Sequence, residues 1–137
     1  MTRYWIGVAS KDHVMRGVKE GFCQLCHGKK APLSRMKSGD QLLYYSPKKE
    51  MRSKEPYQKI VACGMIINDE VYQVEMSLYF HPYRKDVQYR NSIREVPLSE
   101  LNQYNEWKDV RSRLRYGHFE ISEALFYHIY HLTIEKQ

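Results

Sequence analysis

The residues with the most evident chemical potential lie in the pentapeptide Cys23-Gln24-Leu25-Cys26-His27. Two cysteines and a histidine at this spacing form the pattern that attaches haem covalently, and they would also suit half of a zinc site or a redox dithiol. We expect no export signal in residues 1–12, and no second cysteine or histidine pair follows to complete a tetrahedral zinc site. The sequence therefore favours cysteines that pack inside a loop, and it predicts no metal and no cofactor.

Sequence motifs of enzymes do not occur in this chain. It contains no G-x-S-x-G elbow, no phosphate-binding P-loop and no G-x-G-x-x-G fingerprint. The six histidines are scattered, and carboxylates are not paired at a spacing that suits acid–base catalysis. We therefore expect a protein that binds a ligand and is not an enzyme.

Charge points to a polyanionic partner. The 137 residues carry 22 Lys and Arg against 16 Asp and Glu, a net charge of +6, and the basic excess lies in the first 60 residues. A local positive field of this kind attracts nucleic acid, although a solvated basic face would have the same composition. No apolar run approaches the ~20 residues of a membrane span. Three cysteines, an odd number, favour a reducing cytoplasm over a disulfide framework.

The elements that must position the pentapeptide follow from periodicity and turn residues. Ser10 is a suitable cap for a helix, Gly21 a suitable end, and Pro47 ends an apolar strand. The predicted elements of this half are a strand over 3–9, a helix from Ser10 to Gly21, a long ordered loop over 21–38, a strand over 41–46 and an exposed, mobile loop over 48–58.

The second half is predicted to complete one sheet and close it with a helix. The apolar run 60–67 and the alternating run 71–80 are expected to form a hairpin. A strand over 87–96, a short helix over 98–101 and a C-terminal helix capped by Ser122 follow. The fold class is thus α+β, with about five strands in a curled, barrel-like mixed sheet and flanking helices, as a single domain over residues 1–137.

The segment from His27 to Leu33 has the properties of a ligand cradle. Gly28 allows close approach of the backbone, and Pro32 fixes a bend. Lys29 and Lys30 offer donors to phosphate, while Gln24 and His27 can bond the edge of a base. A surface loop that contains two lysines by chance remains the alternative.

These residues also carry a resemblance to a known family. The run G-F-x-Q-x-x-H-G-K-x-A-P-L-x-R-M-K-x-G-D, followed by Y-Y-S-P-K, is similar to the EVE domain, and the residues 4–6, 80–87 and 114–121 extend the similarity over essentially the whole chain. Two positions depart from the pattern: Cys26 creates the haem-like pentapeptide, and His81 stands where we expect arginine. Trp5, within the first of these matches, is expected in the core.

The resemblance implies a PUA-like fold, related to YTH domains, in which a nucleobase leaves its strand and enters a pocket between the sheet and the loop after the first helix. It implies a non-catalytic reader of a modified base in DNA or RNA, expected to be a monomer. The alternative is a stand-alone protein that binds a nucleoside or acidic metabolite. The pocket residues implied are Ser10, Phe22, Cys23, Gln24, His27, Gly28, Lys29, Pro32, Leu33, Tyr45 and Ser46. Phosphate contacts are expected from Lys30, Lys48, Lys49, Arg52 and Arg84.

Overall fold

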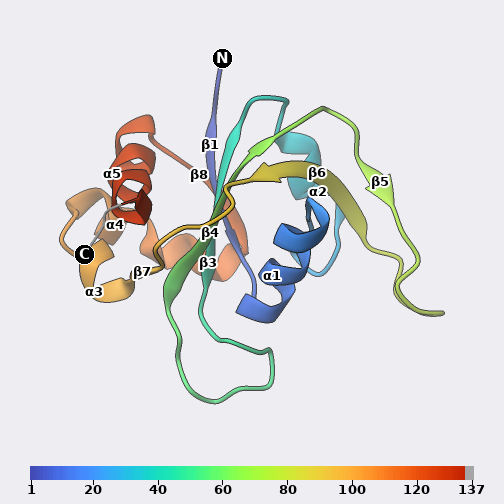
Figure 1. Ribbon diagram of the computed structural model, residues 1–137, viewed down its shortest axis with the longest axis horizontal. Helices are drawn as coiled ribbons and strands as arrows, with labels where there is room; N and C mark the ends of the chain where they lie inside the picture. Colours follow the sequence, from blue (N-terminus) through green and yellow to red (C-terminus); the bar gives the residue numbers. More distant parts are fainter. Residues whose placement is uncertain (135–137) are drawn as a thin grey trace.

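A computed structural model describes residues 1–134, with five helices, one 3₁₀ helix and eight strands among them (Figure 1). In chain order the elements are β1 (Tyr4–Val8), α1 (Lys11–Glu20), β2 (Phe22–Cys23), α2 (Lys30–Arg35), β3 (Gln41–Ser46), β4 (Lys59–Ile66), β5 (Tyr72–Gln73), β6 (Tyr83–Tyr89), β7 (Val96–Pro97), α3 (Leu98–Leu101), α4 (Asn105–Val110), η1 (Arg111–Tyr116), β8 (His118–Ile121) and α5 (Glu123–Ile134).

The strands form one mixed sheet in the order β2-β6-β4-β3-β1-β8, with β5 added to β6 and β7 to β4. β1 and β3 run parallel, because α1 and α2 lie in the connection between them, and the other pairs are antiparallel. Parallel neighbours need such a crossover. Helices α3, α4 and α5 lie on one side of the curled sheet, and α1 and α2 lie on the other (Figure 1).

Each face of the sheet has its own hydrophobic core. Alternate residues of a strand point to opposite faces, so Leu43 and Tyr45 of β3 belong to the core beneath α5, while Leu42 and Tyr44 belong to the core beneath α1 and α2. Trp107 of α4 is fully buried in the first core. β3 is therefore apolar along nearly its whole length, since both of its faces are covered.

Asp40 fixes the entry to β3 against β1. Its carboxylate is buried and accepts hydrogen bonds from the Trp5 indole Nε1 at 3.0 Å, the Arg3 amide at 3.0 Å and the Lys37 amide at 2.9 Å. A buried carboxylate needs several such donors to offset the loss of hydration. Trp5, at 2% exposure, is a core residue, as predicted.

Several predicted elements are confirmed. β1, β3 and α3 have the expected positions, and α1 begins after Ser10 and ends at Gly21, which has a φ of 83°. Ser122 caps α5, since its Oγ accepts a hydrogen bond from the Leu125 amide at 3.0 Å. Ser10, in contrast, donates its hydroxyl to Asp12 and does not cap its helix.

The predicted hairpin of 60–67 with 71–80 is wrong. β4 pairs with β3, β6 and β7, and the alternating run contributes only Tyr72–Gln73 as β5, paired with β6. The alternation in residues 71–80 does correspond to burial, since Tyr72, Val74 and Met76 are partly buried and the residues between them are exposed, but the segment lies against β6 instead of β4. The sequence identified apolar runs correctly and assigned them the wrong partners.

Three further features of the secondary structure differ from the predictions. Residues 21–38 contain β2 and α2, although the segment shows no period, because elements this short give little periodic signal. The predicted strand 87–96 begins earlier, at Tyr83, and ends at Tyr89. Eight strands occur in place of about five, since β2, β5 and β7 have two residues each and β8 was not predicted. The predicted loop over 48–58 contains no strand or helix.

None of the helices within residues 1–134 is both long and apolar enough to cross a membrane.

Candidate functional site

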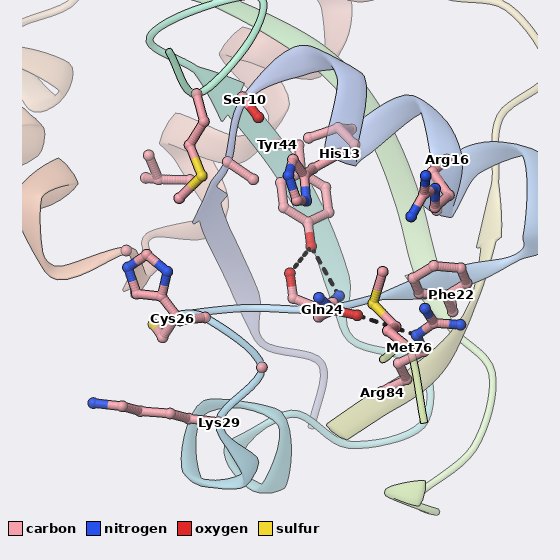
Figure 2. A pocket seen from close by; sticks show the side chains of 18 of the residues that line it. Ser10, His13, Arg16, Phe22, Gln24, Cys26, Lys29, Tyr44, Met76 and Arg84 are labelled. Carbon is pink, nitrogen blue, oxygen red and sulfur yellow. Dashed lines mark hydrogen bonds between the residues drawn. The ribbon is translucent and has the colours of Figure 1, made fainter. Parts of the chain in front are cut away.

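A cavity of about 530 Å³ opens between α1 and the segment 22–29 (Figure 2). Its wall includes the end of β1, one side of α1, Tyr44 of β3, two residues of β6 and the turn that precedes β8. The amides of Lys11 and Asp12, at the start of α1, donate to the carbonyls of Lys48 and Lys49 at 3.0 Å each. These bonds hold the 48–58 loop against α1, so that Met51 completes one side of the cavity.

Tyr44 forms the floor. Its hydroxyl donates to the Gln24 carbonyl at 2.9 Å and accepts from the Gln24 amide at 3.3 Å (Figure 2). Burial raises the pKa of Tyr44 well above its ordinary value. This buried, neutral phenol thus ties the backbone of the 22–29 segment to the centre of the sheet.

Gln24, Arg84 and Phe22 form a stacked group on one wall. The Arg84 guanidinium lies 3.8 Å from the centre of the Phe22 ring, and its Nε donates to the Gln24 Oε1 at 3.1 Å. The Arg84 guanidinium therefore covers one face of the Phe22 ring, and both side chains belong to the lining of the cavity. Because Gln24 Oε1 is occupied, its Nε2 group, for which the described residues supply no acceptor, can donate into the cavity.

The turn between β2 and α2 has an unusual backbone. Cys26, His27 and Gly28 all have positive φ, at 48°, 62° and 82°. Such a run is costly for residues with a Cβ and occurs where neighbouring contacts enforce it. Here the Gly28 amide donates to the Leu25 carbonyl at 2.9 Å, and the Gly28 carbonyl accepts from the Tyr83 amide at 2.9 Å. The turn is thus held between its own start and β6.

The charges around the cavity are of one sign. Four basic side chains line it, from Arg16, Lys29, Arg84 and Arg115, together with two histidines. Among the described residues that line it, none is an Asp or Glu. A cavity of this kind favours ligands with anionic groups or several hydrogen-bond acceptors.

The structure brings together seven of the residues that the sequence singled out. They are Ser10, Phe22, Gln24, His27, Gly28, Lys29 and Arg84, the last of which was expected to contact only phosphate. They come from the end of β1, the 22–29 segment and β6, which are far apart in the chain. The predicted location, beside the loop after the first helix, is where this cavity lies.

Five other predicted pocket residues lie outside the lining. Tyr45 points to the opposite face of the sheet, 5.8 Å from Trp107 between ring centres, because the pleat alternates. Leu33 and Cys23 are buried in the core under α1 and α2. Pro32 and Ser46 are likewise buried and do not reach the cavity.

The four predicted phosphate-contacting residues besides Arg84 are exposed and do not line the cavity; they are Lys30, Lys48, Lys49 and Arg52. The Lys49 ammonium lies 5.5 Å from the centre of the Tyr57 ring, and that of Lys59 lies at 4.6 Å. The Tyr57 hydroxyl also contacts Glu95. Lys49 of the 48–58 loop and Lys59 of β4 therefore both lie near the ring of Tyr57.

Sequence reasoning missed several lining residues. Tyr44, Arg16, Arg115, Met76 and Phe80 belong to the lining. Arg16 shares one face of α1 with the lining residues His13 and Gly17, at helical spacing, but no feature of the sequence marked that face as the one beside the pocket. Met76 and Phe80 carried none, because their position depends on a surface segment that the sequence assigned to a core hairpin.

The C-x-x-C-H pentapeptide is divided by the fold. Cys23 is buried, and burial raises the pKa of its thiol to about 12. Cys26, whose pKa burial also raises, approaches the Tyr116 carbonyl at 3.5 Å, and His27 is exposed. Thiols with raised pKa values are poor nucleophiles and poor metal ligands. Within residues 1–134, no three His, Cys, Asp or Glu side chains are grouped to hold a metal ion.

Comparison with known proteins decides the family. A sequence model of the EVE domain matches residues 3–132. This chain belongs to the EVE domain family. A UPF0310 protein of Streptococcus gordonii is 53% identical over 130 residues, which cover 95% of this chain and 92% of that protein.

Solved structures show that this EVE domain has a PUA-like fold. A hypothetical protein from Leishmania major superimposes with a TM-score of 0.67 at 15% identity, covering 97% of this chain and 95% of that one. Human THYN1, solved in complex with DNA that contains 5-methylcytosine, gives a TM-score of 0.62 at 16% identity, covering 99% and 100%. The fold predicted from the resemblance is confirmed.

Proposed function

We propose that this protein binds nucleic acid without catalysing a reaction, and that its cavity holds one modified nucleobase turned out of its strand. The observation that carries the proposal is the lining of the cavity, with four basic side chains and no carboxylate among the described residues. Its volume of about 530 Å³ lies within the range of ordinary ligand sites. The complex of the similarly folded THYN1 with methylated DNA supports a nucleic-acid ligand.

The wall residues suit a base energetically. Removing a base from its stack costs a few kcal/mol, which the cavity must offset by stacking and hydrogen bonds. The outer face of the Arg84 guanidinium, supported by Phe22, offers a planar surface, and stacking of a base contributes about 1–3 kcal/mol. Gln24 Nε2 offers a donor to a base edge. Arg16, Lys29 and Arg115 would then bond flanking phosphates.

The absence of catalysis is part of the same proposal. Burial raises the pKa of both thiols in the pentapeptide, and the two histidines of the lining have no carboxylate beside them among the described lining residues to orient them as a general acid or base. A cytoplasmic location and a monomeric state stay predictions from the sequence.

Binding is tested by fluorescence anisotropy with single- and double-stranded oligonucleotides that contain either one cytosine or one modified cytosine. We expect tighter binding to one modified base, and affinity that falls as salt rises, because phosphate contacts release counterions. Affinity that is independent of both salt and modification would overturn the proposal. Salt-insensitive binding of a free nucleoside would favour the small-molecule alternative, which the size of the cavity also allows.

Arg84→Ala is expected to weaken oligonucleotide binding about tenfold, because one stacking surface is lost. Arg90→Ala is a matched control: the Arg90 guanidinium also lies over an aromatic ring, that of Tyr130 at 4.9 Å, but Arg90 does not line the cavity. Both variants are first checked by urea unfolding. Equal affinities of the two folded variants would contradict the role assigned to Arg84.

A further inference from the structure

The segment between β5 and β6 presents an apolar tip. Leu78 and Tyr79 are 72% and 93% exposed, on a tight turn closed by two hydrogen bonds between Ser77 and Phe80. Turn tips ordinarily carry Gly, Asn, Asp or Ser, for which solvent is favourable. In Figure 1 this segment extends away from the body of the domain beyond β5. Two large apolar side chains at such a tip indicate a surface that contacts something else.

The same segment also forms part of the cavity. Met76 and Phe80, on either side of the tip, line the cavity, and Figure 2 shows Met76 beside Gln24 and Arg84. Backbone bonds fix the base of the segment, from the Val74 amide to the Pro82 carbonyl at 3.0 Å and from the Tyr83 amide to the Gly28 carbonyl at 2.9 Å. Leu78 and Tyr79 do not line the cavity themselves, but they lie on the turn that joins the two lining residues Met76 and Phe80.

The charge of this segment permits approach to a phosphate backbone. Residues 76–83 contain no Asp or Glu, and Arg84 follows directly. Arg84 and three other basic side chains, from Arg16, Lys29 and Arg115, line the cavity to which this segment contributes Met76 and Phe80. An apolar tip framed by cations matches a partner with an apolar interior and an anionic exterior, which describes a nucleic-acid duplex.

We propose that Leu78 and Tyr79 enter the base stack of a duplex at the place that the extruded base has left. The inference rests on the proposed function and adds a duplex requirement to it. Extrusion leaves a gap whose neighbouring base pairs have lost stacking contacts, and an apolar wedge restores contact there. A single strand has no such gap, so the tip contributes to duplex binding alone.

The test uses the double variant Leu78→Ser/Tyr79→Ser of the full chain. Its affinity is measured for a duplex with one 5-methylcytosine and for the same strand unpaired. We expect duplex affinity to fall on the order of tenfold and single-strand affinity to change less than about twofold. The fluorescence of a 2-aminopurine next to the methylated base, which reports unstacking, should rise with the wild type and less with the variant.

Tyr127→Ser is the matched control, because Tyr127 is an exposed tyrosine of α5 that lies outside the cavity. We expect it to behave as the wild type. If the double variant lost affinity equally for duplex and single strand, or lost none for either, the insertion of Leu78 and Tyr79 into the base stack would be overturned. The proposed function would remain intact. If the wild type binds neither oligonucleotide, both proposals fail.

Discussion

Gly28→Ala is expected to destabilise the protein by about 3 kcal/mol, from the strain of a left-handed backbone and from overpacking. Gly28 has a φ of 82°, and a Cβ there would lie 2.4 Å from the Pro82 Cβ and 2.8 Å from the Pro82 Cα. Pro82 directly precedes β6. Neither Pro82 nor the 26–28 turn can therefore move to relieve the contact without displacing the wall of the cavity. Urea unfolding measures the loss, and anisotropy should show weakened oligonucleotide binding in the fraction that folds.

Gly39→Ala separates the two causes. Gly39 has a similar φ of 91°, but no atom lies within 4 Å of the Cβ that alanine would add. This variant should lose about 1–2 kcal/mol from backbone strain alone and should retain its affinity. Equal losses in the two variants would show that contact with Pro82 does not constrain the 26–28 turn.

His118→Phe is expected to make the protein more resistant to acid, by up to about 3 kcal/mol near pH 4. The His118 ring stacks on Trp5 with 4.7 Å between ring centres, and neither of its nitrogens has a hydrogen-bond partner among the described residues. Burial, aided by the charge of Arg35, lowers the pKa of His118 to about 4. In the unfolded chain an ordinary histidine has a pKa of about 6.5.

The direction of the effect follows from these two values. Between about pH 6.5 and pH 4, His118 is protonated in the unfolded state but not in the folded state. The free energy of unfolding of the wild type therefore decreases as the pH falls through this range. Phenylalanine cannot bind the proton and keeps the ring stack. The free energy of unfolding, measured in urea at pH 7 and pH 4.5, should therefore fall less in the variant.

His131→Phe serves as the control, because His131 is exposed on α5. Some carboxylates have a pKa that is lowered by an ion pair, such as Glu120 beside Arg3. Their protonation in acid lowers the free energy of unfolding by the same amount in the wild type and in both variants. If the free energy of unfolding fell between pH 7 and pH 4.5 by the same amount in His118→Phe as in the wild type, His118 would be shown to bind its proton in the folded state as well.

Local signals in the sequence determined β1, α1 and β3 well, although they missed β2 and α2 between them. The aromatic and β-branched run of β1, the helix from Ser10 to Gly21 and the strand ended by Pro47 each depend on interactions within a few residues. The run of family-like residues around Gln24, His27 and Gly28 also located the cavity, because it identified a segment whose place in the fold is known from its relatives.

The tertiary structure alone decided which side chains face the cavity. β3 is buried on both faces, so its composition does not indicate whether Tyr44 or Tyr45 points toward α1. The stack of Arg84 on Phe22 joins residues 62 positions apart, and it covers one face of the Phe22 ring with a guanidinium. Met76 and Phe80 reach the lining because β6, not the 71–80 run, pairs with β4. Such contacts depend on strand order and pleat direction, which periodicity within one segment does not encode.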